Sequence, residues 1–390
     1  MNSRRDFLKT LSGAALAAGI VPSLASVAWA DSKSGDRIAI PGEYGLIVRS
    51  FRFIDLESPV EYFNSWLTPL PHFFVRNHMH EPSQLDPETW QLTIGGEVET
   101  PLTLKLEDIL KLPTHSVVNT LECAGNGRGL FRPQVPGVQW SKGAVGTARF
   151  SGPRLRDVLD RAGVKPTGKF AAFRGLDEVP GKVPPFIRSI PIEKVLDADS
   201  LIATHMNGAP LPKHHGFPAR ALMPGWIGAA SCKWLTEIKV LESEFVGNFM
   251  NPGYRFPNHP PQPGGSVKPD DTHPLTALNV KSVIAGPLDG AKLEAGPVTV
   301  HGAAWAGEAD VVKVEILTDG SANWNPAKLG NDHAHYAWRL WSYEWKASPG
   351  EHAILSRATD NQGRTQPARP VWNPSGYLYN AYDQVKVHVA

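Results

Sequence analysis

Hydrophobic and polar positions alternate with a short period along much of the chain, and long apolar helical stripes are few. Residues 90–95 and 234–241 have the pattern of short strands. A helical period predicts helices that begin at Leu106 and Glu193, and one over Arg154–Gly163 with Gly163 as its C-terminal stop. The chain up to about residue 241 is therefore predicted to mix strands with short helices.

The pattern changes after the segment Asn251–Pro274, which is rich in proline and glycine and interrupts all periodicity. Beyond it, short alternating runs are separated by turn signals such as Asp319-Gly320 and Asp360-Asn361. The runs lie at residues 298–302, 311–318, 337–345 and 352–358. This rhythm is typical of a β-sandwich. We therefore expect an α+β protein with one domain at 31–270 and a second at 275–390.

The first thirty residues have the features of an export signal. Residues 3–9 form a twin-arginine motif, a mildly apolar run follows from Leu11 to Trp29, and Ala28-Trp29-Ala30 is a small-x-small cleavage signature. A membrane anchor is the alternative, but the run is rich in Ala, Gly and Ser and is broken by Pro22. We expect a signal over 1–30 and a periplasmic protein that the twin-arginine machinery exports already folded.

Composition and charge narrow the classes of function. Gly and Pro together make 71 of 390 residues, which favours turns and short strands. Lysine and arginine number 39 against 38 acidic residues, a net charge of +1. This balance argues against a nucleic-acid partner. Two cysteines exclude a disulfide framework, so each thiol has to be considered by itself.

Cys123 is the more suggestive thiol. It ends an apolar run in Asn119–Arg128, where a strand would open into a turn rich in Gly and Asn. The nearby Arg128 favours the thiolate, which is the form that acts as a nucleophile or a soft-metal ligand. A buried structural cysteine is the commoner fate of a lone thiol. The residues alone leave both interpretations open.

Three further segments combine small residues with charged ones: Phe73–His78, Lys213–Arg220 and Ser231–Trp234. Each is weak by itself, because an arginine or histidine in a loop is usually solvated or caps a turn.

Taken together, these segments resemble the sulfite oxidase family of molybdopterin enzymes. The motifs F-V-R-N-H, L-x-C-A-G-N-x-R, W-x-x-G-A with Trp140, N-G-x-P-L-P-x-x-H-G-F-P-x-R and P-G-x-x-G-A-x-x-x-K-W-L occur in the family's order. Residues 358–367 and 372–374 look like its C-terminal domain. The resemblance implies a sulfite-oxidase-type mixed α/β molybdopterin domain followed by an immunoglobulin-like dimerisation domain, and hence a homodimer.

The resemblance also implies the cofactor and the roles of individual residues. The cofactor would be molybdenum-molybdopterin, with Cys123 as the protein's thiolate ligand to the metal. The pocket for an oxyanion substrate would consist of Arg76, Arg128, Trp140 and Tyr254. Arg220 and Lys233 would lie opposite the pterin phosphate, and His78 near the metal. The expected cofactor contacts are Phe73, Phe74, Val75, Arg76, Asn77, His78, Asp177, His215, Arg220, Ser231, Cys232 and Lys233.

Two positions depart from the animal and plant members of the family. Gly127 and Ser375 stand where those enzymes carry arginines near the substrate. Arg255 could supply the missing charge if its side chain turns inward. We find no C-x-x-C-H haem signature and no room for a haem domain before Phe73. Electrons are therefore expected to leave to a separate acceptor.

The expected activity is the oxidation of sulfite to sulfate with an external c-type cytochrome as electron acceptor. Two alternatives stay within the family: a sulfane dehydrogenase that acts on carrier-bound sulfur, and a sulfoxide reductase. From another class, the chain could be a non-catalytic exported protein with an adhesive β-sandwich. The sequence leaves the acceptor and the oligomeric state open.

Overall fold

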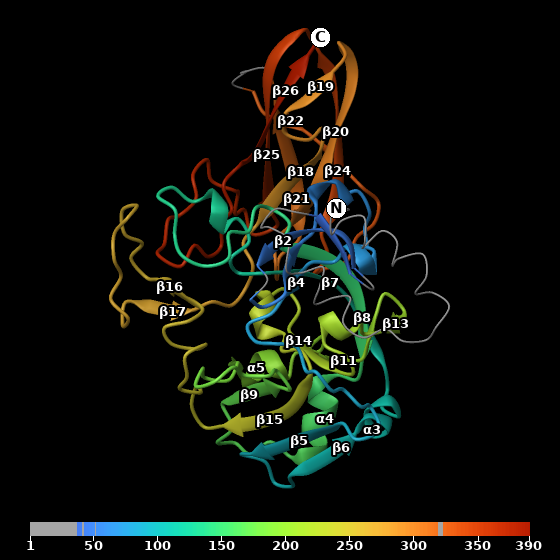
Figure 1. Ribbon diagram of the computed structural model, residues 1–390, viewed down its shortest axis with the longest axis vertical. Helices are drawn as coiled ribbons and strands as arrows, with labels where there is room; N and C mark the ends of the chain where they lie inside the picture. Colours follow the sequence, from blue (N-terminus) through green and yellow to red (C-terminus); the bar gives the residue numbers. More distant parts are fainter. Residues whose placement is uncertain (1–36, 41–42, 51, 319–322) are drawn as a thin grey trace, which may run out of the picture.

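The computed structural model describes residues 37–40, 43–50, 52–318 and 323–390, and the expected signal over 1–30 lies outside them. The molecule is elongated, with a larger mixed part at one end and a β-sandwich at the other, where the C-terminus lies (Figure 1). Within the described ranges no helix is long and apolar enough to cross a membrane.

The main sheet of the larger part forms its outer end (Figure 1). Its strand order is β10-β9-β15-β5-β6; β15 runs parallel to β5, and the other neighbours are antiparallel. Helix α4 ends at Gly163, whose φ of 68° supplies the left-handed stop that the sequence predicts. The bounds are Gln91–Gly96 (β5), Leu102–Lys105 (β6), Phe170–Gly175 (β9), Ile187–Pro191 (β10), Leu235–Leu241 (β15), Leu106–Leu110 (α3), Leu155–Ala162 (α4) and Ile192–Val195 (α5).

Two smaller sheets connect this end to the sandwich. The first has the order β1-β2-β3-β4, and the second has the order β13-β12-β8-β7. The long strand β7 ends at Glu122, directly before Cys123. The bounds are Arg37–Ile40 (β1), Glu43–Ser50 (β2), Asp55–Glu57 (β3), Val75–Arg76 (β4), His115–Glu122 (β7), Val145–Gly152 (β8), His205–Met206 (β12) and Ala209–Pro210 (β13), with the separate pair Leu201–Ala203 (β11) and Arg220–Leu222 (β14).

Short 3-10 turns carry several of the motifs. They are Val60–Tyr62 (η2), Leu70–His72 (η3), Arg128–Leu130 (η4), Lys213–His215 (η5) and Gly228–Ala230 (η6).

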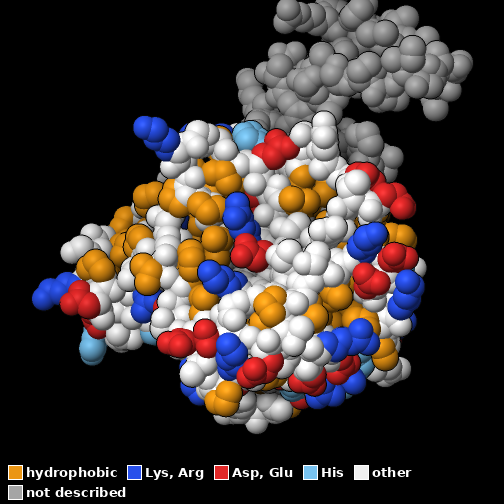
Figure 2. Space-filling model, turned by 90° about the horizontal axis from the view of Figure 1, so that it is seen from below, with side chains coloured by type: hydrophobic (Ala, Val, Ile, Leu, Met, Phe, Trp, Pro, Cys, Tyr) orange, Lys and Arg blue, Asp and Glu red, His pale blue; other side chains and the backbone are white. Residues whose placement is uncertain are grey.

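The segment Asn251–Pro274 is more regular than its composition suggests. It contains a two-stranded hairpin of β16 (Arg255–Pro257) and β17 (Thr272–Pro274), which projects from the body (Figure 1). Prolines are tolerated there because a two-stranded ribbon has only edge strands. On the face seen in Figure 2, acidic and basic side chains are interspersed, as the net charge suggests.

The C-terminal part is the expected immunoglobulin-like sandwich. Its sheets have the orders β18-β20-β24-β23 and β19-β26-β25-β21-β22, and a separate apolar cluster lies between them. The four predicted runs correspond to β20, β21, β24 and β25. The bounds are Lys281–Gly286 (β18), Ala291–Leu293 (β19), Gly296–Trp305 (β20), Val311–Leu317 (β21), Asn325–Pro326 (β22), Lys328–Leu329 (β23), Arg339–Ala347 (β24), Gly350–Asp360 (β25) and Asp383–Val389 (β26).

The largest hydrophobic cluster continues across the junction of the two parts. Trp305 and Trp338 of the sandwich belong to the same cluster as Phe63, Ala124 and Val145. The rings of Phe63 and Trp338 lie 5.1 Å apart. The sandwich is therefore joined to the rest by buried apolar contact as well as by the chain.

A glycine substitution tests how tightly the mixed part is packed. A Cβ at Gly152 in β8 would lie 2.0 Å from the carbonyl oxygen of Ile202, whereas a Cβ at Gly95 would meet nothing within 4 Å. We expect Gly152→Ala to lower the free energy of unfolding by about 1–3 kcal/mol, because the backbone of β11 has to move. Gly95→Ala is the control. Equal urea midpoints for the two variants would contradict the packing described.

Candidate active site

Two cavities meet at one wall in the larger part of the molecule. The inner cavity encloses about 690 Å³ of empty space and the outer one about 1130 Å³. The wall that they share consists of Arg76, His78, Cys123 and Tyr254. The structure thus brings together residues from three distant segments that the sequence analysis selected.

The remaining walls differ in character. Aromatic rings and basic groups line the inner cavity, together with Asn77, Asp177 and Ser231. The outer cavity is bounded by Arg128 and by two loops, residues 248–254 and residues 374–377, the second of which follows the sandwich strand β25. Both parts of the chain therefore contribute to the outer cavity.

Cys123 begins a tight loop that its own backbone closes. Its N–H donates to the carbonyl of Ala144 at 2.9 Å, and its carbonyl accepts from the N–H of Asn126 at 2.8 Å. Burial raises the pKa of the Cys123 thiol, although Arg76 and Arg128 lower it. The neighbouring cations thus do not by themselves produce the thiolate that the sequence suggests. A bound soft metal would do so, because a coordinating thiol is deprotonated.

Arg76 is fixed by a carboxylate from the neighbouring strand. Asp55 of β3 accepts from Arg76 Nη1 at 3.0 Å and from the N–H of Asn77 at 3.2 Å. Burial acts to lower the pKa of Arg76, but the Asp55 carboxylate and other nearby groups together raise it, so the guanidinium keeps its proton. Asp55 thereby holds the segment Phe73–His78, which carries Arg76 and which we term the strip, against the cavity.

His78 and Tyr254 form a hydrogen-bonded pair at the shared wall. Burial lowers the pKa of His78 well below its ordinary value, and the nearby cations Arg76 and Lys233 lower it further. His78 is therefore neutral at physiological pH. Burial also raises the pKa of the Tyr254 phenol, which stays protonated. The pair therefore presents two neutral, hydrogen-bonded groups to the cavities.

A buried cation lies behind Tyr254. Arg188 is only 2% exposed, and its guanidinium carbon lies 4.8 Å from the centre of the Tyr254 ring. One of its terminal nitrogens donates to the carbonyl of Phe249 on the rim of the outer cavity. Arg188 thus adds positive charge close to the shared wall and supports the loop that carries Tyr254.

Arg128 is held in a close backbone nest. It donates to the carbonyls of Ser375 at 2.9 Å and Val138 at 3.1 Å. A Cβ on Gly125 would lie 2.5 Å from this guanidinium, and one on Gly376 would lie 2.7 Å from its side chain. Both acceptors are neutral, so the charge of Arg128 is available to an anion in the outer cavity.

The far end of the inner cavity is basic. Arg220 donates to the carbonyls of His215 at 3.0 Å and Ser231 at 2.8 Å, and its buried Nε has no hydrogen-bond partner among the described residues. Lys233 donates to Asn77 and to the carbonyl of His214. Burial lowers the pKa of Arg220 to about 10 and that of Lys233 to about 8. Both remain cations at neutral pH.

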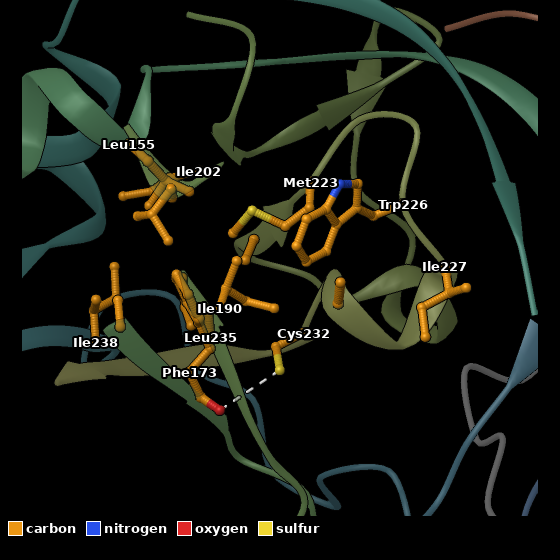
Figure 3. Packing of buried hydrophobic residues seen from close by; sticks show 14 of the residues in the cluster. Leu155, Phe173, Ile190, Ile202, Met223, Trp226, Ile227, Cys232, Leu235 and Ile238 are labelled. Carbon is orange, nitrogen blue, oxygen red and sulfur yellow. Dashed lines mark hydrogen bonds between the residues drawn. The ribbon is translucent and has the colours of Figure 1, made fainter. Parts of the chain in front are cut away.

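Several residues selected from the sequence lie away from both cavities. Val75 packs on the opposite side of its strip with Leu46 and Leu56, as strand alternation requires. Trp140 is fully buried in the cluster that contains Cys123, and its Nε1 has no partner among the described residues. The Cys232 thiol points into the core toward the carbonyl of Phe173 (Figure 3). Burial raises its pKa to about 12.

Arg255 does not supply the missing charge. Its side chain donates twice to Thr272 at 2.8 Å and lies 3.7 Å from Glu244, and it lines neither cavity. Arg255 starts strand β16, whose pairing with β17 turns the side chain toward the hairpin. The expectation of an inward-facing Arg255 is therefore wrong.

Bulky residues at positive φ occur next to this site. Trp234, Tyr254 and Leu378 have φ values of 50°, 57° and 55°. Such conformations cost energy for residues other than glycine, and they persist where surrounding contacts determine them. The Leu378 N–H donates to the carbonyl of Ala124 at 2.8 Å, inside the loop of Cys123.

The family comparisons agree with this arrangement. The oxidoreductase molybdopterin binding domain matches residues 78–249, and the Mo-co oxidoreductase dimerisation domain matches residues 272–390. Mitochondrial sulfite oxidase of Rattus norvegicus is 36% identical over 376 residues, which cover 92% of this chain and 68% of the rat protein. The chain belongs to the sulfite oxidase family of molybdopterin oxidoreductases.

Two further members extend the comparison. Sulfite oxidase of Arabidopsis thaliana is 31% identical to this chain, and the match covers 88% of the plant protein. The crystal structure of the sulfane dehydrogenase SoxCD from Paracoccus pantotrophus superposes with a TM-score of 0.76 at 26% identity, over 97% of this chain and 95% of that one. The sulfite-oxidase-type fold is thus confirmed over both parts of the molecule.

The inner cavity of this family member fits a molybdopterin. Arg220 and Lys233 offer charge to a phosphate, and the unpaired Nε of Arg220 is a donor that a ligand can satisfy. Asp177 offers a carboxylate to the amide and amino hydrogens of a pterin ring. Cys123 places a soft sulfur donor at the wall toward the outer cavity. The donor set therefore suits the cofactor of the family from end to end.

Three residues of the site have no counterpart in the sequence analysis: Asp55, Glu81 and Arg188. Glu81 accepts from His214 Nδ1 and from Asn77 Nδ2, each at 2.8 Å, so this pair supports the strip from outside. No local motif marks these residues, because each acts through a partner that is far away in sequence.

Asp177 gives the site a pH dependence. Burial raises its pKa to about 6 from an ordinary 3.8, although Lys233 lowers it. The native protein then holds a proton between about pH 4 and 6 that the unfolded chain has released, so the free energy of unfolding falls as pH rises through this window. The melting temperature of the cofactor-free protein should therefore fall as pH rises from about 4 to 6, and in Asp177→Asn it should fall less steeply.

The matched control is Glu88→Gln, which removes an exposed carboxylate. It should leave the pH profile of the melting temperature as in the wild type. A profile of Asp177→Asn that falls as steeply as the wild type between pH 4 and 6 would contradict the raised pKa.

Proposed function

We propose that this protein oxidises sulfite to sulfate in the periplasm with molybdenum-molybdopterin and passes the electrons to a c-type cytochrome. In this proposal Cys123 is the metal's protein ligand, and the outer cavity binds the substrate. The twin-arginine motif of residues 3–9 supports export of the folded, cofactor-loaded protein. The match to a dimerisation domain supports a homodimer.

One observation carries the proposal: the Cys123 thiol opens into a cavity lined by Arg76, which Asp55 partly neutralises, and by Arg128, which no carboxylate among the described residues neutralises. In the part of the chain that the structure describes, Arg128 is bonded to carbonyls, and Arg188 adds a buried charge behind Tyr254. Arginine donors suit the oxygens of a sulfur oxyanion, because charge-assisted hydrogen bonds are short and strong. His78 and Tyr254 are neutral and so do not repel it.

The overall reaction takes sulfite and water to sulfate, two protons and two electrons. Molybdenum held by the pterin supplies the two-electron redox chemistry, and two ferric cytochrome haems accept one electron each. The protein binds and orients the oxyanion through Arg76 and Arg128. The His78–Tyr254 pair, neutral in both members, provides hydrogen bonding at the same wall.

A sulfane dehydrogenase is the second candidate, and the outer cavity favours it in two respects. Its space of about 1130 Å³ exceeds what a sulfite ion needs, and Gly127 and Ser375 lack the arginines of the animal and plant enzymes. Tyr379 packs where a side chain at Gly127 would lie, 2.7 Å from the Cβ position. Cytochrome c reduction that needs a sulfur-loaded carrier and does not respond to sulfite would favour this candidate.

The two cysteines should respond differently to substitution. Cys123→Ser is expected to abolish turnover and to remove one sulfur ligand from the molybdenum X-ray absorption spectrum, because only this thiol reaches the cavities. Cys232→Ser should keep both properties, because its thiol lies in the core. Loss of the sulfur ligand in Cys232→Ser alone would overturn the assignment.

Arg128 should contribute directly to the affinity for sulfite. Arg128→Gln removes a charge-assisted hydrogen bond worth roughly 1.5–3 kcal/mol, so KM should rise about ten- to a hundred-fold. Arg255→Gln is the matched control, since this arginine lines neither cavity, and its KM should stay within about twofold. Steady-state cytochrome c reduction gives both constants. An unchanged KM in Arg128→Gln would show that the substrate binds elsewhere or is no oxyanion.

A further inference from the structure

The carboxylate of Glu122 is buried between the two parts of the molecule, directly before the metal-ligand candidate. The side chain is 8% exposed and is the last of strand β7. It accepts from Lys281 Nζ at 2.9 Å, from Trp305 Nε1 at 2.8 Å and from Asn126 Nδ2 at 2.9 Å. A buried carboxylate is costly unless it is paired in this way.

Two of the three donors come from the sandwich. Lys281 starts β18 and Trp305 ends β20, and these two residues are paired across the two strands. The Lys281 side chain is 5% exposed and lies under the rings of Trp305 and Tyr379 at 5.8 Å and 6.0 Å. The sandwich thus presents a preformed cation and an indole N–H to the other part of the molecule.

The third donor ties the carboxylate to the loop Cys123–Arg128, which we term the cysteine loop. Asn126 donates to Glu122 and to the carbonyl of Lys142, and it accepts from the N–H of Ala144 at 3.1 Å. Ala144 in turn accepts from the N–H of Cys123. The Glu122 carboxylate is therefore linked by hydrogen bonds to Asn126 directly and, through Asn126 and Ala144, to Cys123.

We propose that Lys281 and Trp305 are positioning residues that set the place of Cys123 through Glu122. The sandwich, which matches a dimerisation domain, then has a second role, because it also helps to shape the metal site. This inference rests on the proposed function only in taking Cys123 as the metal ligand. Neither residue lines the cavities. Trp305 acts through the carboxylate, and Lys281 acts through the carboxylate and through a longer hydrogen bond to the carbonyl of Asn126 at 3.5 Å.

The main test is hydrogen–deuterium exchange of residues 123–128 in the full-length, cofactor-free protein. Lys281→Met keeps the apolar stem but leaves Glu122 without its cation, and it should speed exchange of this loop at least tenfold. Trp305→Phe removes the indole N–H together with part of the buried ring, and it should have a smaller effect of the same sign because Glu122 keeps its cation. Lys281→Arg should restore slow exchange.

The matched control is Lys194→Met. Lys194 pairs with Glu308 of the sandwich at 2.6 Å and has a side chain that is 7% exposed, so it also joins the two parts by a buried cation. It makes no contact with the cysteine loop among the described residues. Its loss should lower the melting temperature without speeding exchange at 123–128.

The holoenzyme gives a second readout. The EPR spectrum of the molybdenum should shift in Lys281→Met and return in Lys281→Arg, while Lys194→Met keeps the wild-type spectrum. Equal exchange of the loop in Lys281→Met and Lys194→Met would overturn the inference. If Lys281→Met fails to fold, unchanged exchange in Trp305→Phe overturns it instead. Inactivity of the wild type toward sulfite would count against the proposed function but leave the exchange result standing.

Discussion

The need to neutralise one buried carboxylate organises the centre of this molecule. Glu122 lies between a sheet and a sandwich, and its three donors fix both to the loop that carries Cys123. An unpaired carboxylate in this place would cost several kcal/mol, so the two parts are constrained to one relative placement. The shared cluster around Trp305 and Trp338 then adds apolar contact that would be lost if the parts separated.

The same principle explains how positive charge is distributed around the cavities. Arg76 is matched by Asp55, and Lys281 is matched by Glu122, so each of these cations has a structural role that a carboxylate balances. Among the described residues, Arg128, Arg188 and Arg220 are bonded to carbonyls or lie against an aromatic face. Arg220 lines the inner cavity and Arg128 the outer one, so their charge is available to ligands there.

Local signals were sufficient for much of the fold. Alternation predicted β5, β15 and the four sandwich strands β20, β21, β24 and β25, and Gly163 marked the end of α4, because these features depend on neighbours in sequence. The motifs around Cys123, Arg76 and Lys233 likewise marked residues that meet in space. Asp55, Arg188 and the pair of Glu122 with Lys281 could not be found in this way, since each depends on a partner in a distant strand. The direction of the Arg255 side chain was predicted wrongly. It is set by the pairing of β16 with β17, and the residues around Tyr254 do not reveal that pairing.

The closure of the cysteine loop has a consequence for the order in which the protein matures. Arg128 is bonded to the carbonyl of Ser375, 247 residues further along the chain, and Ala124 is bonded to Leu378. A growing chain that has already emerged with all of its cavity-lining segments up to Tyr254 still lacks these contacts. Such long-range closure is slow and comes late in folding. The loop can take its final shape only after the whole sequence to that point has been synthesised, so a correctly formed cysteine loop is a sign that both parts of the chain have folded.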